Sequence, residues 1–285
     1  MIVELDGERV FVGSGSGRWQ GEDTAGPGAG SANATRPVLL LLHGAGMDRT
    51  VWVLQARWFA RHGHDVVAPD LPAHGRSGGA ALGSIEAQAD WAWRLIDTLR
   101  GGDGETPSRG PIVCAGHSMG ALVAVAMAGQ RPKDVERLLL LGAGYPMTVG
   151  EPLLAAAAAN ERAAIDMITV YGHAHASRLG RNPVAGVSVV NQAAALLARA
   201  APGVLHTDLA ACNAWRGAEA AAERFGTDRT VILAGESDRM APARSTHALA
   251  GLLGARVLPI ADCGHMMMSE RPQPTLEAMR AGLEG

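Results

Sequence analysis

Six apolar or β-prone runs recur along the chain and are separated by segments of helical character. They lie at residues 37–42, 65–68, 112–115, 135–141, 230–234 and 255–260. Near-continuous apolar runs of this length are typical of parallel strands that are covered on both faces. Their alternation with helical segments predicts an α/β fold with a mostly parallel, doubly wound sheet.

The clearest helical segment between these runs is 84–100. Ser84 suits an N-cap, acidic residues follow in the first turns, and one side is apolar. Residues 50–62 also place large apolar side chains at mixed helical spacing, and Gly63 ends that segment. Further helices are expected at 244–253 and 275–283, on either side of the last strand.

The N-terminal region has a different pattern. Two β-prone runs, 2–5 and 8–12, flank Asp6-Gly7, which predicts a hairpin. Residues 13–36 are mainly Gly, Ser, Ala and polar residues, with Trp19 as the one bulky apolar side chain, so we expect a long mobile loop.

The alternation of strands and helices is interrupted between residues 145 and 224. This stretch has no convincing strand, whereas 153–164, 165–171 and 192–201 have helical character. We therefore expect a core formed by 1–144 and 225–285, with 145–224 as a helical insertion.

Composition narrows the class of protein. The chain has 285 residues, 47% of them hydrophobic, and a net charge of −3, so we expect neither a nucleic-acid nor a membrane partner. Its three cysteines form no Cys-x-x-Cys pair, and the N-terminus lacks the pattern of a signal peptide. We expect a cytoplasmic protein; nothing in the sequence specifies an oligomeric state.

The candidate chemistry centres on residues 116–120, which read Gly-His-Ser-Met-Gly and stand between an apolar run and an Ala-rich helical segment. A strand, a sharp turn and a helix would lift the Ser118 hydroxyl clear of the sheet, and the flanking glycines would allow close packing. Ser118 is the candidate nucleophile. A second Gly-x-Ser-x-Gly pattern at 75–79 lacks this setting, so Ser77 is interpreted as a loop residue.

The chain resembles the α/β-hydrolase family, and the resemblance covers nearly its whole length. It rests on five pieces in the family's order: His-Gly-Ala-Gly at 43–46, Asp-Leu-Pro-Ala-His-Gly-Arg-Ser at 70–77, Gly-His-Ser-Met-Gly at 116–120, Gly-Glu-Ser-Asp at 235–238 and Cys-Gly-His at 263–265. The resemblance implies an α/β-hydrolase core and places the helical insertion over the active site as a cap.

In this family a catalytic serine is followed along the chain by an acid and then a histidine. The candidates here are Ser118, Asp238 and His265. Asp238 follows the strand at 230–234, where the family places its acid, whereas the rival Asp262 is also compatible with a turn role. The resemblance assigns the oxyanion hole to the backbone N–H groups of Ala45 and Met119.

Ten histidines compete for the role of base. His265 follows the last predicted strand, at the sheet edge where the turn at Ser118 also opens. His117 adjoins Ser118, but neighbouring side chains at such a turn diverge. The pairs His62/His64 and His173/His175 lack a nearby third ligand, so we expect no metal site.

These residues predict a serine hydrolase that needs no cofactor and forms an acyl-enzyme on Ser118. The expected substrate is a carboxylic ester of a small apolar molecule, or a related thioester or lactone. A carbon–carbon bond hydrolase is the first alternative, although such enzymes of this family often carry Trp where this chain has Met266. A small-molecule receptor that keeps the fold without catalysis is the second.

Overall fold

A single sheet of eight strands lies at the centre of the computed structural model, which describes residues 1–15, 38–101, 111–181 and 186–284. The strands are β1 (Ile2–Leu5), β2 (Glu8–Gly13), β3 (Val38–Leu42), β4 (Asp65–Pro69), β5 (Ile112–His117), β6 (Val135–Leu141), β7 (Thr230–Gly235) and β8 (Arg256–Ile260). Their order is β1-β2-β4-β3-β5-β6-β7-β8. β2 runs antiparallel to β1 and β4, and all other neighbours are parallel. The predicted fold class and N-terminal hairpin are confirmed.

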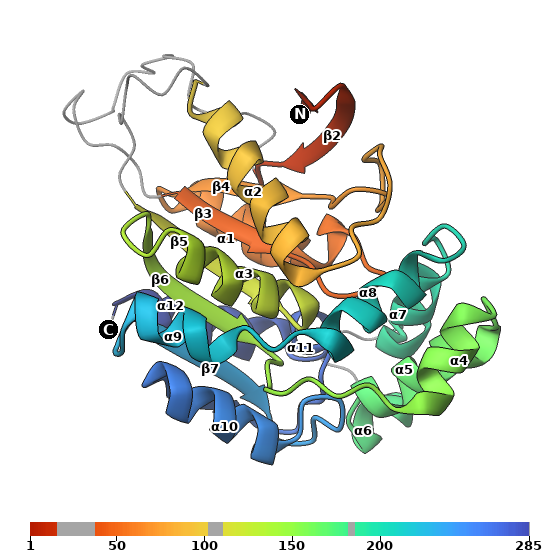
Figure 1. The fold of residues 1–285 in the computed structure, drawn as a ribbon. Helices are drawn as coiled ribbons and strands as arrows, with labels where there is room; N and C mark the ends of the chain where they lie inside the picture. The colour runs from red at the N-terminus through yellow and green to blue at the C-terminus, as the bar shows by residue number, and fades with distance from the viewer. Residues whose placement is uncertain (16–37, 102–110, 182–185, 285) are drawn as a thin grey trace.

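Helices cover both faces of this sheet (Figure 1). One face carries α2 (Ile85–Leu99), α3 (Met119–Gln130), α9 (Ala218–Phe225) and α10 (Ala243–Leu253), and the other carries α1 (Val53–Arg61) and α12 (Pro272–Glu284). The sequence of β3 is apolar throughout because its side chains point alternately to the two covered faces. Leu40 and Leu42 pack into the core on the first face, whereas Leu39 and Leu41 pack into the core on the second.

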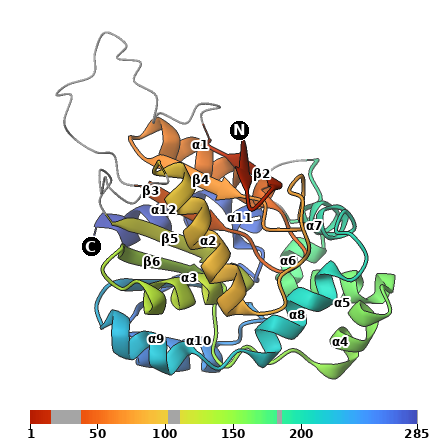
Figure 2. The ribbon, with the colours of Figure 1, turned by 45° about the horizontal axis from the view of Figure 1, so that its top comes forward.

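Most of the helical insertion lies at one end of the sheet (Figure 2). It contains α4 (Glu151–Ala158), α5 (Arg162–Gly172), α6 (His175–Arg178), α7 (Val189–Leu197) and α8 (Val204–Ala214). No strand occurs in the described part of 145–224, as expected. The last helix in this stretch, α9, packs against α3 of the core instead of joining the other five.

The topology brings four loops to the same edge of the sheet. β5 pairs with β3 on one side and β6 on the other, and the parallel ladder continues through β7 to β8. In a parallel sheet all carboxyl ends point the same way, so the segments after β3, β5, β7 and β8 meet there. These segments begin at His43, Ser118, Glu236 and Ala261.

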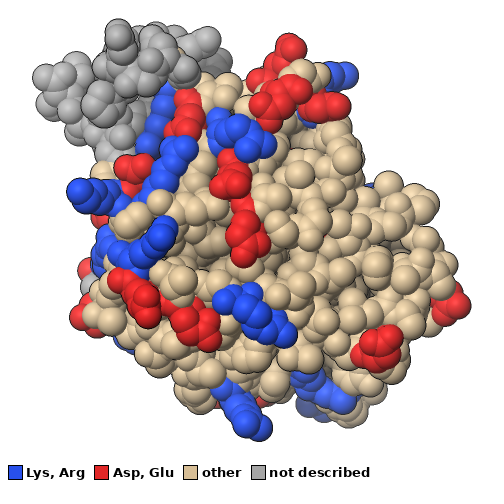
Figure 3. Space-filling view, viewed as in Figure 1, with Lys and Arg blue, Asp and Glu red and all other residues tan. Residues whose placement is uncertain are grey.

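The predicted loop at 13–36 and the Gly-rich link at 101–110 fall outside the described residues, apart from 13–15 and 101. None of the described helices is long and apolar enough to cross a lipid bilayer. On the face shown in Figure 3, Lys and Arg side chains are interspersed with Asp and Glu near α2, α3 and α9, and few charges lie over the insertion.

Candidate active site

Ser118 lies in a sharp turn between β5 and α3. Its backbone has φ 53° and ψ −115°, a conformation that residues other than glycine rarely adopt. The flanking glycines allow the strand and the helix to touch: a Cβ at Gly116 would collide with the Gly120 backbone, and one at Gly120 would collide with the backbone of Leu42. The strand, sharp turn and helix predicted around residues 116–120 are therefore present.

Two backbone amides, those of Met119 and Ala45, lie close to Ser118. Met119 is the first residue of α3, so its N–H has no partner within the helix. Ala45 lies in the loop after β3, which approaches Ser118 closely at Gly44. Among the described residues, neither amide donates a hydrogen bond. Both are therefore available to a negatively charged oxygen.

Asp238 and His265 form a buried pair. His265 Nδ1 donates to Asp238 Oδ2 at 2.8 Å, and both side chains are about 2% exposed. The other carboxylate oxygen accepts from the amides of Met240 at 2.8 Å and Ala241 at 2.9 Å. Burial alone would raise the pKa of Asp238, but attraction to His265 and these hydrogen bonds outweigh it and hold the pKa below its usual value. Asp238 is therefore an ionised group that orients His265.

Ser118 and His265 line one cavity of about 340 Å³. Its remaining walls are mostly apolar and come from core loops and from the insertion, among them Met47, Met147, Leu153, Met167, Ile168 and Leu209. Within the described part of the chain, no hydrogen bond joins the Ser118 hydroxyl to His265. Because Asp238 occupies Nδ1, Nε2 is the ring nitrogen that remains for proton transfer.

The backbone around His265 is anchored from three sides. The ring of His117 donates through Nε2 to the His265 carbonyl at 3.0 Å, and the His265 amide donates to the Gly172 carbonyl at 2.9 Å. The buried carboxylate of Glu270 accepts from the amide of Gly264 at 2.9 Å and from that of Ala174 at 3.2 Å. Burial and the nearby His265 lower the pKa of His117 to about 3, so His117 is neutral. Spacing along the sequence gave no signal for this support of the histidine loop.

A second network holds the loop that contains Ala45. Asp208, a fully buried residue of α8, accepts through Oδ2 from the Gly46 amide at 2.8 Å and from His74 Nε2 at 2.8 Å. His74 Nδ1 lies 2.9 Å from the Pro72 carbonyl. Both partners of this ring are acceptors, which favours an imidazolium. Burial opposes that charge, but Asp208 outweighs it and raises the pKa of His74.

The rival residues have other surroundings. Ser77 links strand β2 to the loop after β4 through its hydroxyl, which accepts from the Phe11 amide and donates to the Asp70 carbonyl. Asp262 is exposed in a turn with φ 51° and makes no bond to His265. Cys212 lines the cavity, but burial raises the pKa of its thiol and keeps it protonated. Within the described ranges, no three His, Cys, Asp or Glu residues cluster as metal ligands.

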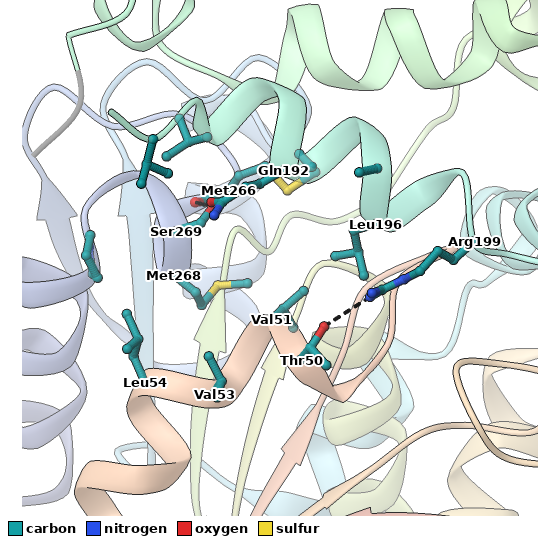
Figure 4. Close-up of a pocket in the computed structure, with 15 residues that line it drawn as sticks. Thr50, Val51, Val53, Leu54, Gln192, Leu196, Arg199, Met266, Met268 and Ser269 are labelled. Carbon is teal, nitrogen blue, oxygen red and sulfur yellow. Dashed lines mark hydrogen bonds between the residues drawn. The ribbon is translucent and has the colours of Figure 1, made fainter. Parts of the chain in front are cut away.

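A separate apolar cavity of about 640 Å³ lies between the start of α1, α7 and the short helix α11 (Met267–Glu270) (Figure 4). Arg199 stands at its edge, where it donates to Thr50 and forms an ion pair with Asp48 at 2.6 Å. This cavity shares Met266 with the one above Ser118 but contains none of the three triad candidates. The smaller cavity is therefore the candidate site of reaction.

Comparisons with known proteins agree with the mostly parallel α/β fold described above. A curated relative from Acinetobacter baylyi, named (E)-2-((N-methylformamido)methylene)succinate hydrolase, is 37% identical over 111 residues, which is 39% of each chain. The match thus spans about two fifths of that relative's length. Among solved structures, an enol-lactonase from Burkholderia xenovorans LB400 is similar over the whole of both chains, with a TM-score of 0.78 and 19% identity. A Thermogutta terrifontis esterase has a TM-score of 0.77 and 19% identity, over 100% of this chain and 97% of its own.

At such identities the solved structures show a shared fold alone. The family assignment comes from residues 39–278, which match the model of the family described as "Alpha/beta hydrolase family". This range contains the turn at Ser118, the buried pair of Asp238 and His265 and the loop of Ala45. The chain belongs to the alpha/beta hydrolase family.

Proposed function

We propose that this protein is a serine hydrolase that cleaves a carboxylic ester, or a related thioester or lactone, through an acyl-enzyme on Ser118. The observation that carries the proposal is the buried Asp238–His265 pair, whose imidazole lines the same cavity as Ser118. A serine hydroxyl is a weak nucleophile and needs a base that is itself oriented by a third group. These three residues supply that combination.

In the proposed reaction, Ser118 Oγ attacks the carbonyl carbon and its proton passes to Nε2 of His265. The amides of Ala45 and Met119 stabilise the oxyanion, each donor being worth about 3–4 kcal/mol in comparable sites. His265 then protonates the leaving alcohol, and the acyl-enzyme remains. Water attacks next, with His265 again as the base, and Ser118 recovers its proton when the acid leaves.

The insertion, α4 to α8, is proposed as the cap that selects the substrate. It supplies Leu153, Met167 and Leu209 to the cavity, facing the core residues Met47 and Met266. A cavity of about 340 Å³ whose apolar lining includes several flexible methionines suits a small and largely apolar molecule. The esterase and lactonase names of the structural neighbours agree with ester and lactone substrates.

The proposal is tested with a chromogenic short-chain ester and three variants. The parent should turn the ester over, whereas Ser118→Ala and His265→Gln should each lower kcat by about 10³-fold or more. Gln at 265 can still donate to Asp238, which limits damage to the fold. His117→Gln is the matched comparison, because its ring acts on the backbone of His265, and it should retain far more activity.

Covalent labelling separates the explanations for a negative result. An active serine should react with a fluorophosphonate in the parent and not in Ser118→Ala, with the modified peptide containing residue 118. A panel of esters, thioesters and lactones then identifies the favoured bond. Equal rates in the parent and Ser118→Ala would reject the nucleophile, and tight binding without turnover or labelling would indicate a receptor.

A further inference from the structure

The cavity above Ser118 contains one permanently charged side chain, Arg239. This residue follows Asp238 directly in the loop between β7 and α10. No Asp or Glu is among the residues that line the cavity, whose other walls are mainly Met, Leu, Ile, Val and Ala side chains. Arg239 is exposed, so its charge is accessible to a ligand that enters from solvent, and no lining carboxylate offsets that charge.

The guanidinium of Arg239 has an aromatic neighbour and no anionic one. Its Cζ lies 4.6 Å from the ring centroid of Tyr171, a residue of α5 that lines the same cavity. Among the residues that the structure describes, no carboxylate forms an ion pair with it. The adjacent Asp238 is already engaged by His265 and two amides. The guanidinium therefore lies over the Tyr171 ring, and no described carboxylate occupies the N–H groups that a ligand would use.

The adjoining cavity extends the same electrostatic pattern. This space of about 420 Å³ shares Met147, Thr148 and Met240 with the cavity above Ser118. Its one charged lining residue is Arg244, and no acidic residue lines it. Two arginines and no carboxylate thus stand on the side of the site formed by residues 239–244. A neutral ester needs neither cation, whereas a ligand with an anionic end would be attracted by both.

We propose that the natural substrate carries a carboxylate at the end remote from the scissile carbonyl and that Arg239 binds this group. The inference deepens the proposed hydrolase function and rests on it. The apolar body of the substrate lies among the methionines and leucines, and its carboxylate meets the guanidinium in the two-pronged geometry that arginine favours. Arg239 therefore determines specificity and takes no part in bond cleavage.

The test compares two substrates that differ only at the far end of the acyl chain. These are p-nitrophenyl hexanoate and the mono-p-nitrophenyl ester of adipate, in which a carboxylate replaces the terminal methyl group. The parent should favour the adipate ester in kcat/KM after subtraction of the uncatalysed rate. Arg239→Gln should lower the adipate-to-hexanoate ratio by about tenfold or more, mainly through KM, and Arg239→Lys should recover part of it.

The ratio compares two substrates on the same variant, so a general loss of active enzyme cancels from it. Arg178→Gln is the matched control, because Arg178 is an exposed arginine of α6 that does not line the cavity, and its ratio should equal that of the parent. Added salt should weaken the parent's preference for adipate. A parent that favours hexanoate, or an unchanged ratio in Arg239→Gln, overturns the inference.

The two proposals fail in different ways. Hydrolysis of hexanoate that depends on Ser118 supports the hydrolase whatever the ratio. Absence of turnover and of serine labelling would instead remove the hydrolase itself.

Discussion

At the scale of single residues, the backbone of Ser118 shows a conflict between stability and presentation of the hydroxyl. Its φ of 53° with ψ of −115° costs on the order of 1–3 kcal/mol for a residue with a Cβ. The turn persists because β5 and the N-terminal part of α3 are completely buried on both sides of it. The turn places Ser118 at the edge of the sheet, where it lines the same cavity as His265.

A comparison of two inactive variants measures this strain. Neither Ser118→Gly nor Ser118→Ala has the hydroxyl, but glycine adopts the observed φ and ψ without steric cost. We expect Ser118→Gly to have a free energy of unfolding about 1 kcal/mol higher than that of Ser118→Ala, measured by denaturant titration. Ala126→Gly, within regular α3, is the control and should instead lower stability by about 1 kcal/mol. A Ser118→Gly variant less stable than Ser118→Ala would contradict the strain.

At the scale of elements, the strands were predictable and the insertion was less so. Buried parallel strands such as β3 are apolar on both faces, so their sequence alone identifies them. The predicted break between the first two helices of the insertion was misplaced. It occurs at Asn160, which has φ 54° and accepts from the Gly203 amide at 2.6 Å, a contact between distant residues. Helix α8 was missed because its buried face includes the charged Asp208, whereas the apolar Ala210 lies off that face, so its apolar side chains form no single stripe.

The candidate site also has parts that the sequence predicted and parts that it did not. Ser118, Asp238 and His265 could be chosen as candidates because parallel strands bring their carboxyl ends to one edge, in an order that the family shares. Their supports were not, since Asp208 and Glu270 act on backbone amides of loops that are remote in sequence. No periodicity or motif marks a residue that acts only after folding has brought two segments together.

Asp208 is the main polar connection between α8 and the loops of the core. Asp208→Ala would leave the Gly46 amide without its acceptor and the buried His74 without its counter-ion. Loss of one partner of a buried pair typically costs about 3–5 kcal/mol, so we expect a fall of that size in the free energy of unfolding. The loop that carries the Ala45 amide would also lose its anchor, and kcat should fall.

Asp166→Ala is the matched control for Asp208, because it removes an aspartate of the insertion whose ion pair with Arg162 is exposed. Such pairs contribute at most about 1 kcal/mol. Equal stability losses in the two variants would show that the buried network does not hold α8 to the core. Unfolding followed by circular dichroism and by activity at matched temperature separates loss of fold from loss of catalysis.

At the scale of the whole molecule, buried histidines link folding to pH. Burial lowers the pKa of His43 to about 3, with a further effect from His74, and it lowers the pKa of His117 to about 3 as well. Burial also lowers the pKa values of His64 and His173. Because the unfolded chain binds protons on these rings that the folded chain excludes, their contribution is present above about pH 6.5 and is lost as the pH falls. His74 acts in the opposite sense, since its raised pKa makes its contribution fall only as the pH rises.

The protein should therefore unfold in mild acid, before most carboxylates are protonated. Each fully excluded proton changes the free energy of unfolding by about 1.4 kcal/mol per pH unit, so His43 and His117 together supply about 2.7 kcal/mol per unit between roughly pH 6 and pH 4. Over two pH units this loss of free energy approaches the total stability of an ordinary domain, which is about 5–15 kcal/mol. Denaturant midpoints measured across this range give the slope, and His43→Gln should reduce it by about 1.4 kcal/mol per unit, because Gln takes up no proton on unfolding. A slope that is unchanged in His43→Gln would mean that His43 is protonated in the folded protein, contrary to its buried contacts with the Gly44 carbonyl and the Leu71 amide.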